Sequence, residues 1–324
     1  MASAETGQRG AVILWDLKGG KRVATFRPHS ESLVALSFNA DCSLIVTVGT
    51  DSQRRVLVVV WGVQSLAVQG SALSVVAKQI SEFPISKIRF SPHPDPTPSL
   101  VSCGRENIRF FRVRKGHLPA SPVILNEFAR GFIYSDFAFL EDPLCATTSP
   151  SLEGTRRCAL FASNRGILLK VDCIKKSVLC AYQLHTGAIR SLALHSGYAV
   201  TGGADSRLRV WPLDFSDFLL ESQHEAAVTS VCLSGDGRKL SVGTAAGTLG
   251  VLDVKEHRCE VWSACVWCIA LYSIVFYYNV LYCTVFYYKL RSVSSSILLY
   301  PNLTPTNPTK SLHHSQPKSV ISCT

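Results

Sequence analysis

Residues 202–215, with the sequence GGADSRLRVWPLDF, combine a turn, a strand and a bulky terminal residue. A polar turn around Asp205 leads into alternating apolar and polar residues, and the segment closes on Trp211, directly before Pro212. Alternation with period two predicts a half-buried β-strand. Proline has no N–H to donate to a sheet, so we expect the strand to end there. If other strands place a bulky residue at the same position, the chain is built from repeats.

Five further segments follow this pattern, and they recur along most of the chain. Successive anchor residues are separated by 46, 50, 60, 40 and 41 residues, close to the ~40–45 residues of a four-stranded propeller blade. A helical solenoid would instead space its apolar residues at three and four. The segments are AVILWDL (Trp15), VLVVVWGV (Trp61), IRFFRV (Phe111), ILLKVD (Val171), LRVWPL (Trp211) and LGVLDV (Leu252).

The repeat units share polar residues as well, and these resemble the WD-repeat family. In that family a histidine, a strand serine or threonine, a turn aspartate and the tryptophan often form a buried hydrogen-bond relay. The resemblance implies one relay from His185, Thr201, Asp205 and Trp211, and a second from His29, Thr47, Asp51 and Trp61. A buried indole N–H needs an acceptor, and a buried imidazole needs partners for both nitrogens. The alternative is that histidine, threonine and aspartate activate a hydroxyl for catalysis, but active sites do not recur in tandem repeats.

The predicted fold is all-β: an incomplete WD-repeat β-propeller of about five to six blades of four-stranded antiparallel sheet. We expect residues 1–10 to start within a blade, residues 11–254 to form the propeller, and residues 255–324 to be a tail outside it. Most WD propellers close with seven blades, since closure protects the sheet edges. The sequence therefore reads as an excerpt of a longer protein.

A closer resemblance is carried by WPLDFSDFLLESQHE at 211–225, because generic repeats have no such linker between blades. RGAVILWDL at 9–17 and VSCGRENIRFFRV at 101–113 agree with it. These segments are similar to the family of WD repeat-containing protein 90. The resemblance implies a microtubule-associated scaffold of the centriole wall that supports cilium assembly, with tubulin or centriolar scaffold components as partners. A general cytosolic WD-repeat adaptor in another multiprotein complex is the alternative.

No enzyme activity, cofactor or metal is expected. The glycines at 19–20 lack the spacing of a nucleotide-binding loop, and no zinc pattern of paired cysteines and histidines occurs in residues 11–254. Residues 1–9 have no apolar core typical of a secretory signal. Cysteines such as Cys103 and Cys158 lie in apolar runs, as small buried hydrophobes do in a reducing compartment. We therefore expect a cytoplasmic protein, and the resemblance implies a place in the cytoskeleton, at the centriole or the ciliary base.

The best partner-binding candidate is the basic segment RENIRFFRVRK at 105–115. The net charge of the chain is +10, which favours acidic partners without choosing among them. Acidic tubulin tails could bind this segment by charge, whereas a solvated strand end is the alternative. Phe110 and Phe111 could stack on nucleic acid bases, but their place in the repeat favours the core, so nucleic acid is not expected. The candidate residues are Arg109, Arg112, Arg114 and Lys115.

The tail begins with an uncharged apolar segment, residues 261–288. Its length exceeds the ~20 residues needed to cross a bilayer. Tyrosine and phenylalanine crowd its middle, whereas membrane spans keep tyrosine at their interfaces. The following Ser/Thr/Pro-rich sequence has no acidic residue and is typical of unstructured chain. We expect a disordered or aberrant tail, and a membrane-anchored propeller or a final, poorly recognisable blade are the less favoured alternatives.

Overall fold

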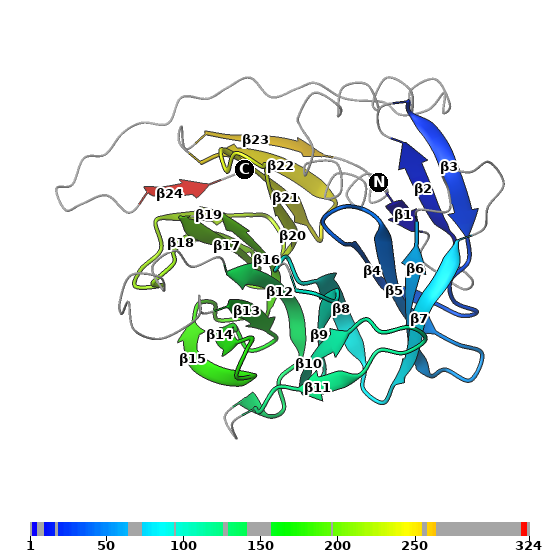
Figure 1. The fold of residues 1–324 in the computed structure, drawn as a ribbon. Coiled ribbons are helices and arrows are strands. Elements are labelled where there is room, and N and C mark those ends of the chain that lie inside the picture. Colours follow the sequence, from blue (N-terminus) through cyan, green and yellow to red (C-terminus); the bar gives the residue numbers. More distant parts are fainter. Residues whose placement is uncertain are drawn as a thin grey trace.

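The computed structural model describes the propeller region with short gaps and little of the tail. All described regular elements are β-strands, arranged in six sheets. In Figure 1 the sheets follow one another around a common centre, from β1–β3 in blue to β20–β23 in yellow. The described residues are 2–4, 10–16, 19–63, 73–93, 95–125, 129–140, 157–195, 197–254, 258–263 and 319–322.

Each blade is an antiparallel meander, with its strands side by side in chain order. The first three blades cover the first third of the chain. The first described sheet has three strands, and the next two have four each. They are β1 (Ala2–Ala4), β2 (Val12–Asp16) and β3 (Lys21–Phe26); β4 (Leu33–Phe38), β5 (Leu44–Thr50), β6 (Val56–Gly62) and β7 (Ser74–Ser81); and β8 (Ile85–Phe90), β9 (Ser99–Gly104), β10 (Asn107–Arg112) and β11 (Ala120–Pro122).

The fourth to sixth blades repeat the four-stranded meander. A last strand, β24 (Ser319–Ser322), lies parallel to β19 at the outer edge of the fifth blade. The strands are β12 (Tyr134–Leu140), β13 (Cys158–Ser163), β14 (Ile167–Asp172) and β15 (Ser177–Gln183); β16 (Ile189–His195), β17 (Tyr198–Gly203), β18 (Arg207–Pro212) and β19 (Leu220–Gln223); and β20 (Val228–Leu233), β21 (Lys239–Thr244), β22 (Thr248–Asp253) and β23 (Arg258–Ser263).

Five of the six predicted anchor residues lie on the third strand of a four-stranded blade, and Trp15 lies on β2 of the three-stranded first sheet. In the second to sixth blades each anchor sits opposite the residue that comes four positions before the last second-strand residue paired with the first strand. The pairs are Trp61–Ile45, Phe111–Leu100, Val171–Ala159, Trp211–Ala199 and Leu252–Leu240. The sequence spacing therefore identified one structural position, and the all-β propeller prediction is confirmed.

The meander gives each blade two ends with different roles. Turns between the second and third strands, together with the connections between blades, lie on one face of the propeller. We call this the relay face because it carries the turn with Asp205. Turns between the first and second strands, and between the third and fourth, lie on the opposite face, since successive strands are antiparallel. The end of β10 at Arg112 and the connection 113–119 to β11 are therefore on the opposite face.

Five hydrophobic clusters form the core, and each spans one boundary between successive blades. Ile45 packs with Val12 across the first boundary, and Phe111 packs with Val58 across the second. The third cluster joins the third and fourth blades, the fourth joins the fourth and fifth, and the last joins the fifth and sixth. Among the described residues, the blades are thus held as a series of neighbours.

The first strand of each four-stranded blade has an irregular register near its start. In every case one residue is skipped in the pairing with the second strand, as in a β-bulge. The skipped residues are Val34, Ser86, Ser135, Arg190 and Thr229. These strands lie side by side around the centre, so the bulges end the regular ladders at the relay face.

The propeller extends beyond the boundary expected at residue 254. Strand β23, Arg258–Ser263, pairs with β22 along its length and completes the sixth blade. The candidate membrane segment, residues 261–288, lies outside the described residues except for its first three, which belong to β23. Within the described chain no helix is long and apolar enough to cross a membrane.

Candidate functional site

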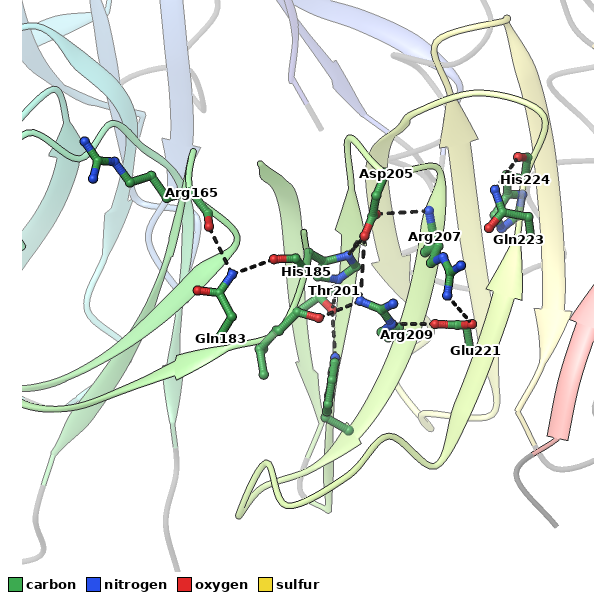
Figure 2. A network of polar contacts seen from close by, with 12 residues as sticks. Arg165, Gln183, His185, Thr201, Asp205, Arg207, Arg209, Glu221, Gln223 and His224 are labelled. Carbon is green, nitrogen blue, oxygen red and sulfur yellow. Dashed lines mark hydrogen bonds and ion pairs between the residues drawn. The ribbon is translucent and has the colours of Figure 1, made fainter. Parts of the chain in front are cut away.

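A continuous chain of hydrogen bonds connects the four predicted relay residues of the fifth blade (Figure 2). The indole Nε1 of Trp211 lies 2.8 Å from Oγ1 of Thr201, and Nε2 of His185 lies 2.8 Å from the same oxygen. Nδ1 of His185 lies 2.9 Å from Oδ1 of Asp205. Strands β17 and β18 supply Thr201 and Trp211, the turn between them supplies Asp205, and the connection before β16 supplies His185.

The donors in this chain have one consistent direction. The Trp211 indole can only donate, so the Thr201 hydroxyl accepts from it and gives its own proton to Nε2 of His185. Nδ1 of His185 then carries the proton and donates to the Asp205 carboxylate. Each polar group of the relay is therefore satisfied within the blade.

The same geometry would serve a nucleophile, because a hydroxyl donates to imidazole and imidazole donates to a carboxylate. Access decides against this role. Thr201 is 0% exposed, and its oxygen already accepts the indole N–H of Trp211. A substrate has no approach to this oxygen, so the arrangement is a buried structural relay.

Arginine side chains extend the polar network from Asp205 to the outer strand (Figure 2). Arg209 lies 3.7 Å from Asp205 and donates to Glu221 at 2.6 Å, while Arg207 donates to the other oxygen of Glu221 at 2.7 Å. Burial raises the pKa of Asp205, but the hydrogen bond from His185 and nearby positive charges more than offset this and hold it below its usual value. Arg207 and Arg209 are therefore neutralised locally.

The second blade has only part of the relay. Trp61 donates to Oγ1 of Thr47 at 3.0 Å, and Nε2 of His29 lies 3.0 Å from that oxygen. Asp51 does not complete the chain: its carboxylate binds Arg55 and the backbone of its own turn. The β5–β6 turn is longer than the β17–β18 turn and contains competing arginines, which explains the difference. Nδ1 of His29 is buried with no hydrogen-bond partner among the described residues.

The first blade contains a relay contact that sequence reasoning missed. Nε1 of Trp15 donates to Oγ of Ser3 at 2.8 Å. Ser3 occupies the same register position on β1 as Thr47 does on β5 and Thr201 on β17. The available sequence signal was Ser3, a hydroxyl residue that precedes Trp15 at a spacing similar to that between threonine and tryptophan in the other two relays.

The burial of His29, with no partner for its Nδ1 among the described residues, predicts that the stability of the protein depends on pH. Burial lowers the pKa of this imidazole from 6.5 to about 4. As the pH falls below about 6.5 the unfolded chain takes up a proton that the folded blade does not, so stability is lost until about pH 4. We expect a loss of about 2 kcal/mol between about pH 7 and about pH 5, measured by urea unfolding. The carboxylates with lowered pKa values act at lower pH, because their stabilisation is lost only below their ordinary range.

The variant His29→Gln is the control for this prediction, because an amide keeps a polar partner for Thr47 but does not titrate. It should reduce the drop in unfolding free energy between the two pH values. Burial also lowers the pKa of His224, so a smaller drop in the same direction should remain. An unchanged drop in His29→Gln would contradict the assignment to His29.

The structure divides the four candidate basic residues into two groups. The guanidinium of Arg109 lies 4.2 Å from the ring centroid of Phe83 and is half-buried, so it packs within the blade. Arg112, Arg114 and Lys115 are exposed. Their loop is held against the outer strand of the second blade, where the N–H of Gly116 donates to the carbonyl of Val76 at 3.0 Å. Only these three form a surface, on the face opposite the relay.

A second polar network, which the sequence analysis did not find, links four first strands around the propeller centre. Asp136 on β12 is buried; it lies 2.8 Å from Nη2 of Arg89 on β8 and accepts from the N–H of Leu192 on β16 at 3.0 Å. Ser191 donates to Asp136 at 3.4 Å and accepts from the N–H of Val231 on β20 at 3.0 Å. We call this the central network. The sequence signal for this network was Asp136, the lone charged residue in the apolar segment YSDFAFL.

The described residues contain no group of three or more histidines, cysteines or acids that could hold a metal ion. The hydrogen-bonding atoms of the complete relay bind one another, and Asp136 and Ser191 of the central network bind groups on three neighbouring inner strands.

The repeats and the blade geometry define the chain as a WD-repeat β-propeller. The family model "WD domain, G-beta repeat" matches residues 20–53 and 176–212. The first range contains the histidine and the aspartate of the partial relay, and the second contains those of the complete relay. The crystal structure of the Cps50 (Swd1) β-propeller domain of Myceliophteria thermophila shares the fold, with a TM-score of 0.62 at 12% identity over 81% of this chain and 82% of that chain.

Relatives of known name are similar over most of this chain. "Centriole proteome protein 16" of Chlamydomonas reinhardtii is 32% identical over 79% of the chain. "WD repeat-containing protein 90" of Xenopus tropicalis is 33% identical over 79%, and that of Homo sapiens 31% over 78%. The chain spans only 13%, 14% and 15% of the length of these proteins, respectively.

Proposed function

We propose that this propeller is a non-enzymatic interaction scaffold of the centriole and the base of the cilium. The observation that carries the proposal is the similarity, over about four-fifths of the chain, to proteins named for the centriole or as WD repeat-containing protein 90. The buried relay supports it, because the polar groups that resemble a catalytic set are inaccessible. A rigid propeller offers faces and rims to partners.

Localisation tests the proposal directly. The tagged chain, expressed in ciliated cells, should concentrate at centrioles and lose that signal when the propeller is unfolded by a core substitution. A diffuse cytosolic distribution of a folded chain, with recovery of an unrelated multiprotein complex, would favour the general adaptor instead.

Within this function, Arg112, Arg114 and Lys115 are the proposed contact for acidic tubulin tails. Changing all three to glutamate should abolish microtubule co-sedimentation at low salt, because an exposed charge contact depends on sign and is screened by salt. Arg109 is left unchanged, since it packs on Phe83.

The matched control changes Lys21, Arg22 and Lys175 to glutamate, three exposed cations on other blades. It alters the net charge equally and should leave co-sedimentation intact. Equal loss in both variants would mean that only overall charge matters. A wild-type chain that never pellets with microtubules would reject the contact.

A further inference from the structure

The fourth blade places two arginines where the fifth blade has its relay histidine and aspartate. In register, Arg130 corresponds to His185, because both stand four residues before the first paired residue of the inner strand. Arg165 corresponds to Asp205, because both stand two residues after the last paired residue of the second strand. Both arginines are exposed on the relay face.

This blade does not need the relay for stability. Phe161 and Val171 replace the relay threonine and tryptophan in register. Phe161 stacks on Phe137 with ring centroids 5.2 Å apart and meets Tyr134 edge-on at 6.3 Å. Because apolar packing holds the blade, the polar positions at its end are released from a structural role.

A third arginine joins the pair through the connection between the third and fourth blades. The N–H of Glu106 donates to the carbonyl of Phe132 at 2.8 Å, and residues Arg105 and Ile133 form a bridge. Asn164 exchanges hydrogen bonds with Ile133 from the other side. The two turns and the connection are thus fastened together, with Arg105, Arg130 and Arg165 on one exposed surface. We call these three residues the arginine cluster.

The packing around Phe132 and Gly131 fixes Arg165 in place. The Arg165 guanidinium lies 5.3 Å from the ring centroid of Phe132, which is itself buried. Gly131 has φ +77, a conformation that turns the connection back beneath the arginines. Figure 2 shows the guanidinium of Arg165 directed away from the relay, while its carbonyl binds Gln183.

The cluster keeps its charge, unlike the corresponding turns of neighbouring blades. Arg55 is paired with Asp51 in the second blade, and Arg207 and Arg209 are paired with Glu221 in the fifth. No carboxylate of the described residues forms an ion pair with any member of the cluster. Lys87 and Arg190 are exposed on the flanking strands β8 and β16 and add further positive charge.

We propose that the arginine cluster binds an acidic, extended polypeptide segment rich in glutamate or aspartate. Arginine recognises carboxylates through paired N–H donors, and unneutralised cations on one face attract such a segment. Single-stranded nucleic acid binding requires exposed aromatic rings for base stacking, whereas Phe132 and Tyr134 here are buried. This goes beyond the proposed function: it concerns another face and holds wherever the protein acts.

The test measures binding of a fluorescein-labelled oligoglutamate peptide to the full chain by fluorescence anisotropy at low salt. Changing Arg105, Arg130 and Arg165 to glutamate should weaken binding by about tenfold or more. The variant Lys21→Glu/Arg22→Glu/Lys175→Glu, with the same charge change at exposed cations elsewhere on the propeller, should bind like wild type. The single variant Arg130→Glu changes an exposed side chain that forms no ion pair or ring contact with the described residues. It guards against misfolding and should weaken binding in the same direction.

Three results would overturn the proposal. The first is equal weakening by both triple variants, which would reduce the effect to net charge. The second is tighter binding of an oligonucleotide of equal charge, lost in the cluster variant, which would make the surface a nucleic acid site. The third is absence of measurable binding by the wild-type chain at low salt.

Discussion

Replacing Trp211 with alanine is expected to lower the free energy of unfolding by about 3–5 kcal/mol. Trp211 is 6% exposed and packs edge-on against Phe218 at 5.9 Å, in the cluster that joins the fourth and fifth blades. Alanine leaves a cavity there and removes the donor to Thr201. Urea unfolding of both proteins, followed by circular dichroism, measures the difference.

Trp211→Phe separates the two causes, because a benzene ring retains most of the packing but has no N–H. It should cost about 1 kcal/mol for the lost hydrogen bond plus a smaller packing term. A loss below about 1 kcal/mol for the alanine variant itself would show that the indole contributes little to the core.

Asp136→Ala is expected to cost about 2–4 kcal/mol, the second largest effect of a single substitution. The change leaves the Leu192 N–H and the Arg89 guanidinium without their buried acceptor, at the meeting point of three inner strands. The lower part of the range allows for Arg89, whose side chain is 34% exposed and partly hydrated. Urea unfolding again gives the value.

A double-mutant cycle with Arg89→Met tests the pair itself. The double variant should be less destabilised than the sum of the single variants, because the uncompensated charge is removed together with its partner. Glu82→Ala, at an exposed acid, is the matched control and should change stability by less than about 0.5 kcal/mol. Additive effects would mean that Asp136 and Arg89 do not interact energetically.

The blade register could be predicted from the sequence because it depends on local pattern. Alternation and a bulky residue recurring at one position identified the third strands of the five four-stranded blades and strand β2 of the first sheet. The fifth-blade relay was likewise readable, since His185, Thr201, Asp205 and Trp211 come from consecutive elements. Family resemblance supplied the expected contacts.

Other features depend on which of several partners a side chain binds, or on contacts between residues that are far apart in the sequence. A local sequence pattern reports neither. Asp51 has the right position, but arginine in a longer turn binds its carboxylate more directly than His29 would. The central network joins residues such as Asp136 and Ser191, which are 55 positions apart and on different blades. Arg109 looked like part of a basic surface until its stacking on Phe83 was known. Strand β23 was assigned to the tail because the apolar composition begins within it.

The five clusters that each span one blade boundary also determine the order in which the blades lose their structure. A blade between two neighbours shares side chains with both, whereas the first and sixth blades share a cluster with one neighbour only among the described residues. In such a nearest-neighbour array, loss of order spreads inward from the least-supported blades. The arginine cluster lies between the third and fourth blades, in the middle of the series, so its geometry would outlast fraying at either end.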